Sequence, residues 1–381
     1  MSNIQPLDLK GELTDESISS MLWMGIKSEC SDFHAQTNFP FTAEINGVMT
    51  PLMTEPLTKE GARKIAFYLL DQKEGILSSI GNGHGIQYGC QVVDPQDKTN
   101  IRRLRYSGLL SRTLKFGQTI TSTARLLPKK PKTGEELGLP EELIELVKST
   151  KRGIILIVGA TGSGKSTTMG GLICELLNQK GPGKKIMCFE DPIEAMYDEV
   201  ERHPTNIISQ HEVGDLRHGA EMVSYEEALK TCLRSAPDVL TIGELRNYET
   251  LIPAIAFSNT GHLLISTLHA NCAASAYARL YNMLPTAKSD NAYYDLLSEV
   301  VCVIAQTLVH TADGRRLPLL EISYNTEEIR SQLATCTTTN EIRKVIDADL
   351  ERRESTFYHL ANKAYEAGLI SPDELSSQRR L

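Results

Sequence analysis

Residues 152–176 read RGIILIVGATGSGKSTTMGGLICEL, with an unbroken apolar run from Ile154 to Val158, a loop that holds three glycines, and then a helical pattern. Such an apolar run is typical of a parallel strand that is buried on both faces. The loop GATGSGKS matches the phosphate-binding pattern G-x-x-x-x-G-K-[ST], between the strand and the helix that this pattern requires. The stretch therefore predicts an α/β domain built around a phosphate site.

Each residue type in this loop has a chemical reason. Glycines lack a Cβ, so the backbone can adopt positive φ and close around a phosphate with its N–H groups pointing inward. Lys165 can place its ammonium on the β and γ oxygens, Ser166 can offer a hydroxyl to Mg²⁺, and the helix start adds the positive end of its dipole. A Gly-rich turn that matches the pattern by chance is the alternative, which the flanking strand and helix disfavour. The residues expected to hold a nucleoside triphosphate are Gly159, Ala160, Thr161, Gly162, Ser163, Gly164, Lys165, Ser166 and Thr167.

The composition is that of an ordinary soluble protein, with 41% apolar and 23% charged residues, and the length of 381 residues suggests two or three domains. We expect a cytoplasmic chain, because the amino terminus is polar and acidic and no apolar run is long enough to cross a membrane. Eight cysteines without a C-x-x-C pair favour buried free thiols. The net charge of −8 argues against direct nucleic-acid binding.

Residues 1–127 are expected to form a small α+β domain. Alternating apolar residues around an Asn-Gly turn predict a β-hairpin over 41–52, and residues 58–73 carry a helical pattern. Further strands are expected near 101–108 and 118–127. The noticeable feature of this domain is a set of arginines, for each of which a solvated strand face is the simpler interpretation: Arg102, Arg103, Arg105, Arg112 and Arg125.

Residues 128–140 have the composition of a linker, with several prolines and two glycines, and predict a hinge. Residues 141–381 then form the domain that contains the phosphate loop. Its last part, from residue 325 onward, reads as helices that cap this domain or dock onto a partner.

Polar residues flank three more strands of the second domain; His262 directly precedes one of them, and the others follow their strands. Strands near 185–189, 239–242 and 263–267 are expected from their apolar runs, and parallel strands of an α/β sheet bind ligands at their carboxyl ends. A helix N-cap or a surface charge would explain any one of these groups alone, but not all of them together. The polar groups expected to converge on the phosphate loop are Glu190, Asp191, Glu194, Gly243, Glu244, His262 and His269.

Phosphoryl transfer to water needs a metal ion to neutralise the phosphate oxygens and a carboxylate to orient the attacking water. Glu244 is the candidate for that carboxylate, because it follows an apolar strand. Glu190, Asp191 and Glu194 could hold Mg²⁺ through waters, since Mg²⁺ keeps much of its hydration shell. We expect Ser166 and Asp191 to be the metal-binding residues.

The two histidines have a functional and a structural interpretation. His269 and His262 each abut an apolar strand, so either could be a buried structural histidine. The functional interpretation is a sensor that donates a hydrogen bond to the γ-phosphate and relays hydrolysis to the next subunit. Zinc binding is disfavoured, because neither histidine lies in an H-E-x-x-H pattern or beside a cysteine pair.

Four ordered motifs resemble the Walker A, Asp box, Walker B and His box of the secretion-superfamily traffic ATPases: GATGSGKSTT, FEDPIE, ALKTCLRSAPDVLTIGELRNYET and TGHLLISTLHA. That family includes the pilus retraction ATPase PilT and the type II and type IV secretion ATPases. SDFHAQTNFPFTAEINGVMTPL and IAQTLVHTADGRRLPLLEISY are similar to further parts of the PilT-like chain. Asn247 stands where the family commonly has Asp, and the stretch 206–227 is longer than in retraction ATPases. These departures make the DotB-like ATPases of type IVB secretion and their conjugative relatives the subfamily most similar to this chain.

The resemblance implies a RecA-like ATPase core after a PAS-like amino-terminal domain, with ATP and Mg²⁺ as cofactors. It also implies a homohexamer at the cytoplasmic face of an envelope machine, with inner-membrane secretion proteins and a coupling protein as candidate partners. Arg105 and Arg125 match positions near the family's arginine fingers, which reach a neighbouring subunit's nucleotide. The function expected is that of a type IV secretion traffic ATPase, with pilus retraction as the first alternative. A nucleic-acid motor and a nucleotide-gated scaffold without turnover are more distant ones.

Overall fold

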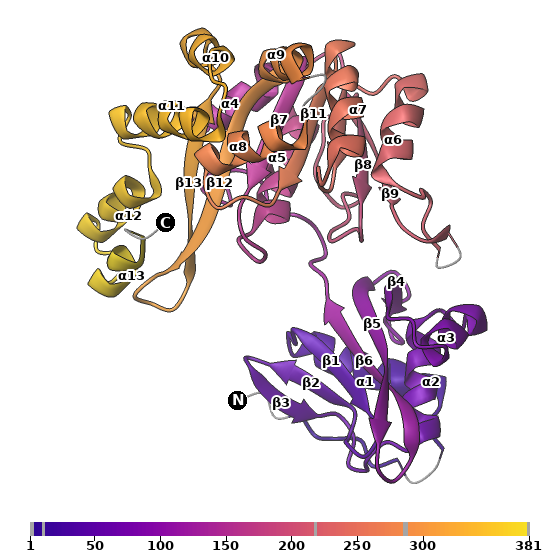
Figure 1. The fold of residues 1–381 in the computed structure, drawn as a ribbon. Coiled ribbons are helices and arrows are strands. Elements are labelled where there is room, and N and C mark those ends of the chain that lie inside the picture. The colour runs from indigo at the N-terminus through magenta and orange to yellow at the C-terminus, as the bar shows by residue number, and fades with distance from the viewer. Residues whose placement is uncertain (1–3, 10–11, 217–218, 285–288, 379–381) are drawn as a thin grey trace. The chain divides into compact units, whose positions relative to one another are not determined.

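The computed structural model describes residues 4–9, 12–216, 219–284 and 289–378 in two compact units. The first unit contains the described residues of Met1–Lys130, Pro192–Met196 and Gly214–Glu221, and the second contains the rest. Each unit is described by itself (Figure 1). Across the described part of the chain, no helix combines the length and the apolar character that crossing a membrane needs.

The first unit is a six-stranded antiparallel sheet with strand order β3-β2-β1-β6-β5-β4, packed with helices (Figure 1). The expected hairpin is confirmed, since its two central residues, Asn46 and Gly47, both have positive φ. The expected helix is confirmed as well, with Thr58 as its N-cap, and an additional helix precedes the sheet. The elements are α1 (Asp15–Lys27), β1 (Asp32–Gln36), β2 (Thr42–Ile45), β3 (Val48–Pro51), α2 (Lys59–Leu69), α3 (Glu74–Gly81), β4 (Ile86–Val93), β5 (Ile101–Thr113) and β6 (Gly117–Leu126).

The second unit is a seven-stranded sheet with strand order β13-β12-β7-β11-β10-β8-β9, in which every neighbouring pair except β12 and β13 is parallel. The predicted α/β class is therefore confirmed. The strands are β7 (Gly153–Val158), β8 (Lys185–Glu190), β9 (Ile207–Glu212), β10 (Val239–Ile242), β11 (Leu263–Leu268), β12 (Val300–His310) and β13 (Arg316–Tyr324).

Helices cover both faces of this sheet, which explains why its central strands are apolar throughout. Residues of β7 alternate between two cores: Ile155 and Ile157 pack with α4 and α5, whereas Leu156 packs with the helices that follow β9. The helices are α4 (Glu141–Ser149), α5 (Lys165–Asn178), α6 (Tyr225–Cys232), α7 (Tyr248–Asn259), α8 (Ala273–Met283), α9 (Ser289–Glu299), α10 (Glu327–Ala334), α11 (Thr339–Arg352), α12 (Phe357–Glu366) and α13 (Pro372–Ser377).

The segment expected as a linker is shorter in the structure than its composition suggests. The division between the units falls after Lys130, and the residues that follow pack on the second unit. The backbone N–H of Gly134 donates to Glu175 Oε1 at 3.0 Å, and Leu139 is buried in the core beside α4. Prolines and glycines mark irregular backbone, but they do not show whether that backbone is packed.

The carboxyl end of α5 is held by one buried side chain. Asn206 is 2% exposed, and its amide donates to the carbonyls of Leu177 and Gln179 at 2.7 and 2.9 Å, while its Oδ1 accepts from Lys184 N at 2.8 Å. Helix ends leave carbonyls without intrahelical partners, so this side chain satisfies groups that would otherwise be buried alone.

We expect Asn206→Leu to lower the free energy of unfolding of the second unit by about 1–3 kcal/mol, because buried carbonyls lose their donors. Urea unfolding followed by far-UV circular dichroism measures this change. The fluorescence of Trp23, the single tryptophan of the chain, reports the first unit and serves as an internal reference. The matched control is the exposed Asn282→Ala, and an equal loss in both variants would contradict the assignment.

Candidate functional site

The loop between β7 and α5 has the shape of a phosphate site. Gly164 is the N-cap of α5 with φ +90°, a left-handed conformation that favours glycine, and no side chain caps the helix there. Lys165 Nζ donates to the carbonyls of Gly159 and Ala160, each at 2.9 Å, so the ammonium already lies against the loop. Ala160, Thr161, Gly162, Ser166 and Thr167 are exposed. A lysine ammonium and the amides of a helix start are together a site for an anion.

One residue outside the predicted set, Gln306, holds this loop from the adjacent strand. Gln306 of β12 is 3% exposed, and its Nε2 donates to the carbonyl of Ser163 at 2.8 Å. Its Oε1 accepts from the hydroxyl of Thr168 at 2.6 Å. The available signal was a single glutamine inside the apolar run VVCVIAQTLVH, where a buried amide needs partners.

Glu244 and His269 meet because they follow neighbouring parallel strands, β10 and β11. His269 Nε2 lies 3.7 Å from Glu244 Oε1, and Arg246 Nε donates to Glu244 Oε2 at 2.7 Å. The ends of the two strands are also joined through Thr267, whose hydroxyl donates to the carbonyl of Gly243. Arg246 thus holds one oxygen of the glutamate, the other oxygen lies toward His269, and the glutamate side chain is 15% exposed.

A buried tyrosine lies over the same strand end. The ring of Tyr225, in the first turn of α6, packs so closely on Gly243 that a Cβ there would overlap the phenol oxygen. Burial raises the pKa of Tyr225, and the negative charges of Asp191, Glu190 and Glu244 raise it further, while Arg246 opposes them. The phenol therefore stays protonated beside the carboxylates.

The three carboxylates after β8 do not act as one group. Glu190 accepts from Gln210 Nε2 at 3.2 Å, and Asp191 is exposed. Glu194 belongs to the segment that groups with the first unit, where Arg105 Nη1 pairs with its Oε1 at 3.2 Å. One expected arginine finger is therefore paired with one expected catalytic carboxylate.

The second expected finger is also paired within the first unit. Arg125 Nε donates to Asp32 Oδ1 at 2.9 Å, and the carboxylate of Asp32 is 8% exposed. Arg105 and Arg125 lie directly opposite each other on β5 and β6. Both guanidinium groups thus belong to one region of this sheet.

The expectation that His262 converges on the phosphate loop is wrong for this chain. His262 precedes β11, at the amino edge of the parallel strands, whereas the loop and His269 lie at the carboxyl edge. Its carbonyl accepts from Gly153 N, the first residue of β7, and its ring stacks on Phe257 with centroids 4.8 Å apart. His262 is adjacent to β11 in the sequence, but it precedes the strand, whereas the side chains near the phosphate loop follow their strands.

The residues expected to bind Mg²⁺ partly suit that ion. Ser166 is exposed in the first turn of α5, and oxygen ligands suit Mg²⁺. Asp191 follows β8, and β11 and β10 separate β8 from β7, so the two strand ends are about 14 Å apart. Ser166 would therefore hold the ion directly and Asp191 through water. Bound there, Mg²⁺ would neutralise charge on phosphate oxygens.

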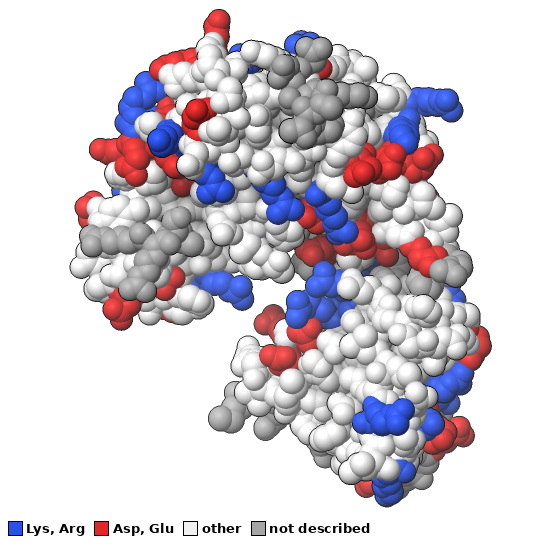
Figure 2. Space-filling view, in the orientation of Figure 1, with Lys and Arg blue, Asp and Glu red and all other residues white. Residues whose placement is uncertain are grey.

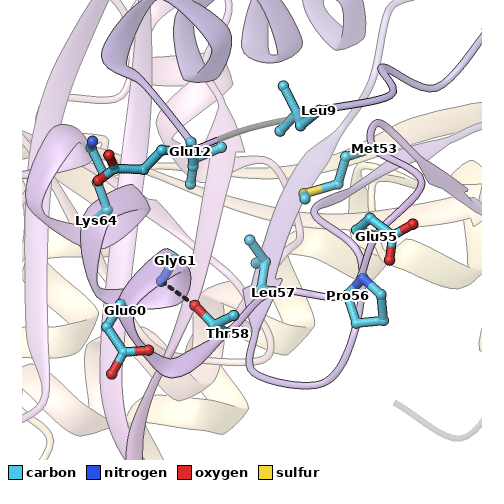
Figure 3. Close-up of a pocket in the computed structure, with 11 residues that line it drawn as sticks. Leu9, Glu12, Met53, Glu55, Pro56, Leu57, Thr58, Glu60, Gly61 and Lys64 are labelled. Atoms are coloured by element: carbon cyan, nitrogen blue, oxygen red, sulfur yellow. Dashed lines mark hydrogen bonds between the residues drawn. The ribbon is translucent and has the colours of Figure 1, made fainter.

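A cavity of about 350 Å³ lies in the first unit and contains none of these residues (Figure 3). Leu9, Leu13, Met53 and Leu57 contribute its apolar lining, and Glu12, Glu55, Glu60 and Lys64 contribute charges. The N-cap bond from Gly61 N to the hydroxyl of Thr58 lies at its edge (Figure 3).

We expect Gly243→Ala to lower stability by about 1–3 kcal/mol, because the new Cβ would overlap the hydroxyl of Tyr225. Adding Tyr225→Phe removes that oxygen and should recover part of the loss. Urea unfolding of the two single variants and the double variant measures this coupling. Strictly additive losses would show that the two side chains do not meet.

The chain matches the family model for "Type II/IV secretion system protein" over residues 119–354. It is similar to the type IV pilus ATPase PilU of Pseudomonas aeruginosa, with 31% identity over 355 residues that cover 93% of this chain and 86% of PilU. The solved structure of the ATPase DotB of Legionella pneumophila matches with a TM-score of 0.80 and 26% identity over 98% of both chains. The pilus retraction motor PilT with bound ADP also matches with a TM-score of 0.80 and 26% identity, over 96% of this chain and 97% of that one. The chain thus belongs to the type II/IV secretion system protein family, a family of secretion and pilus ATPases.

Proposed function

We propose that this chain is a Mg²⁺-dependent ATPase that powers macromolecular transport across the bacterial envelope. The observation that carries the proposal is the phosphate loop with Lys165 against its carbonyls, at the same sheet edge as the paired Glu244 and His269. An anion site and an oriented carboxylate are the two parts that phosphoryl transfer to water requires. The bound ADP of PilT, a relative at 26% identity, supports an adenine nucleotide as the ligand.

The proposed roles follow the positions of the side chains. Lys165 would leave its carbonyl partners for the β and γ oxygens, and Ser166 would hold Mg²⁺. Glu244 orients the attacking water and accepts its proton, and Arg246 keeps the carboxylate in place. His269, 3.7 Å from Glu244, detects the γ-phosphate and reports its loss.

The active assembly in this proposal is a homohexamer. Arg105 and Arg125 would serve as fingers for a neighbouring subunit's nucleotide, and each would first leave its carboxylate, Glu194 or Asp32. The short segment about Lys130, where the two units divide, is the proposed hinge. Exchange of these ion pairs would couple nucleotide binding to movement of the first unit.

Type IVB secretion or conjugation is the proposed setting, with the protein in the cytoplasm and recruited to inner-membrane secretion proteins. The match to DotB over 98% of both chains supports it. The match to the pilus retraction motor PilT, also with a TM-score of 0.80, supports pilus retraction as the second candidate. On the face in Figure 2, acidic and basic side chains are interspersed, and with the net charge of −8 this favours both over a nucleic-acid motor.

Lys165→Ala should abolish ATP binding, because it removes the ammonium from the phosphate loop. Glu244→Gln should still bind ATP but hydrolyse it about 100-fold more slowly or worse, because the amide cannot accept the proton of the attacking water. Calorimetric binding and phosphate release with Mg²⁺ measure the two effects. Glu249→Gln, an exposed glutamate in the first turn of α7, is the matched control. Normal turnover of Glu244→Gln would refute its assigned role.

The two settings differ in the proteins that the ATP-bound state should retain. Glu244→Gln, expressed at native level in its source cells and isolated with ATP, should retain inner-membrane secretion subunits and a coupling protein. Mass spectrometry of the captured proteins measures this, with Lys165→Ala as the nucleotide-free control. Recovery of a pilus platform protein instead would contradict the secretion setting and indicate that the ATPase drives pilus retraction.

A further inference from the structure

We infer that Gln306 is a positioning residue that sets the affinity for ATP by holding the phosphate loop in its binding shape. The inference rests on the proposed function, since it concerns the nucleotide bound by the same loop. Gln306 lies in the middle of β12, a strand beside β7, and its side chain is 3% exposed. Because the side chain is buried, we expect it to affect nucleotide binding through the shape of the loop rather than by direct contact with the nucleotide.

The amide of Gln306 joins the phosphate loop to the first turn of α5. Its Nε2 donates to the carbonyl of Ser163, just before the helix, and its Oε1 accepts from the hydroxyl of Thr168, in the first turn of α5. Both bonds are short, at 2.8 and 2.6 Å, and both are buried. A single rigid amide therefore fixes where the loop ends and where the helix begins.

The loop also lies directly against this strand. A Cβ on Gly164 would come within 2.8 Å of Gln306 Nε2, and a Cβ on Gly159 would overlap the carbonyl oxygen of Gln306. Two of the three loop glycines are thus needed for close approach to Gln306, in addition to any approach to phosphate. The sequence motif and β12 are parts of one packed unit.

The two hydrogen bonds of Gln306 should strengthen ATP binding by ordering the loop in advance. Gly162 and Gly164 are glycines with positive φ, and glycine loses more conformational freedom on ordering than other residues. A loop that is ordered before the ligand arrives does not lose that freedom on binding, which strengthens the affinity. No side chain caps the start of α5. The hydrogen bonds of Gln306 therefore take the place of a cap and keep the loop ordered from the adjacent strand.

A purely structural role is the alternative, and the two differ in what they predict. A structural amide stabilises the fold and affects binding only through the folded fraction. A positioning amide acts on the loop within the folded protein. Its loss therefore lowers the ATP affinity even when the folded fraction is unchanged. Because the β and γ phosphates stay in the loop through the transition state, KM should rise while kcat stays nearly constant.

The test uses the full chain with ATP and Mg²⁺. In Gln306→Leu both bonds are lost, and in Thr168→Val one is lost while Oε1 is left without its donor. Thr168→Ser keeps the hydroxyl and should rescue binding. The matched control is Asn325→Leu, since Asn325 is also a buried amide of this unit and donates to two carbonyls, those of Leu297 and Val300, at 2.7 Å. Calorimetry gives the ATP affinity, phosphate release gives KM and kcat, and urea unfolding gives stability.

We expect Gln306→Leu to weaken ATP binding and raise KM by about 10- to 100-fold, with kcat nearly unchanged. Thr168→Val should weaken binding by about 10-fold, and the double variant should be no worse than Gln306→Leu, because the two side chains form one contact. Asn325→Leu should lose stability but keep its ATP affinity. If Gln306→Leu does not fold, the ATP affinities of Thr168→Val and Thr168→Ser are compared instead, and only Thr168→Val should bind more weakly.

Normal ATP affinity in Gln306→Leu, or in Thr168→Val, would overturn the inference. An equal loss of affinity in Asn325→Leu would overturn it too, because the effect would then follow stability. A wild-type chain that binds ATP without hydrolysing it would refute the proposed ATPase function, while the affinities would still decide the role of Gln306.

Discussion

A loop of backbone amides can hold a phosphate only if something other than its own side chains keeps it open. In this chain the residues of that loop are mostly small, and Gly164 begins the helix without a side-chain cap. Two supports compensate for this: Lys165 lies against the carbonyls of Gly159 and Ala160, and Gln306 bonds to Ser163 and Thr168 from the adjacent strand. The proposed site depends on both, because the first supplies charge and the second supplies shape.

The order of the strands then decides which side chains can cooperate. β7, β11, β10 and β8 are neighbours in that order, so their carboxyl ends form one edge. Glu244 and His269 are in contact because their strands are adjacent, whereas the end of β8 is three strands from the phosphate loop. The carboxylates at the end of β8 are thus suited to an indirect role, and Glu190 is bonded to Gln210 of the neighbouring strand β9.

The sequence predicts the parts of this site that are local. The phosphate loop, the strands β8, β10 and β11 that precede the polar residues, and the Asn-Gly hairpin all follow from patterns within a few residues, and the structure contains them. The parts that it does not predict depend on which segments meet. Gln306 is 138 residues away from Thr168, and no local pattern marks that contact.

The same reason explains the other differences. The position of His262 at the amino edge follows from strand direction relative to β7, and the packing of Gly134 on Glu175 follows from tertiary contact. Only the family resemblance points to Arg105 and Arg125, and their pairing with Glu194 and Asp32 depends on residues far away in the chain. Composition suggested exposed arginines and a flexible linker, but only the folded structure shows their partners.

The most direct test of this account is an experimental structure of the full chain with a non-hydrolysable ATP analogue and Mg²⁺. The account predicts that the phosphates lie in the loop and that Lys165 Nζ has moved from the carbonyls of Gly159 and Ala160 to the β and γ oxygens. The bonds of Gln306 to Ser163 and Thr168 should be unchanged. Phosphates bound elsewhere, or a loop that closes only after Gln306 has released both partners, would contradict it.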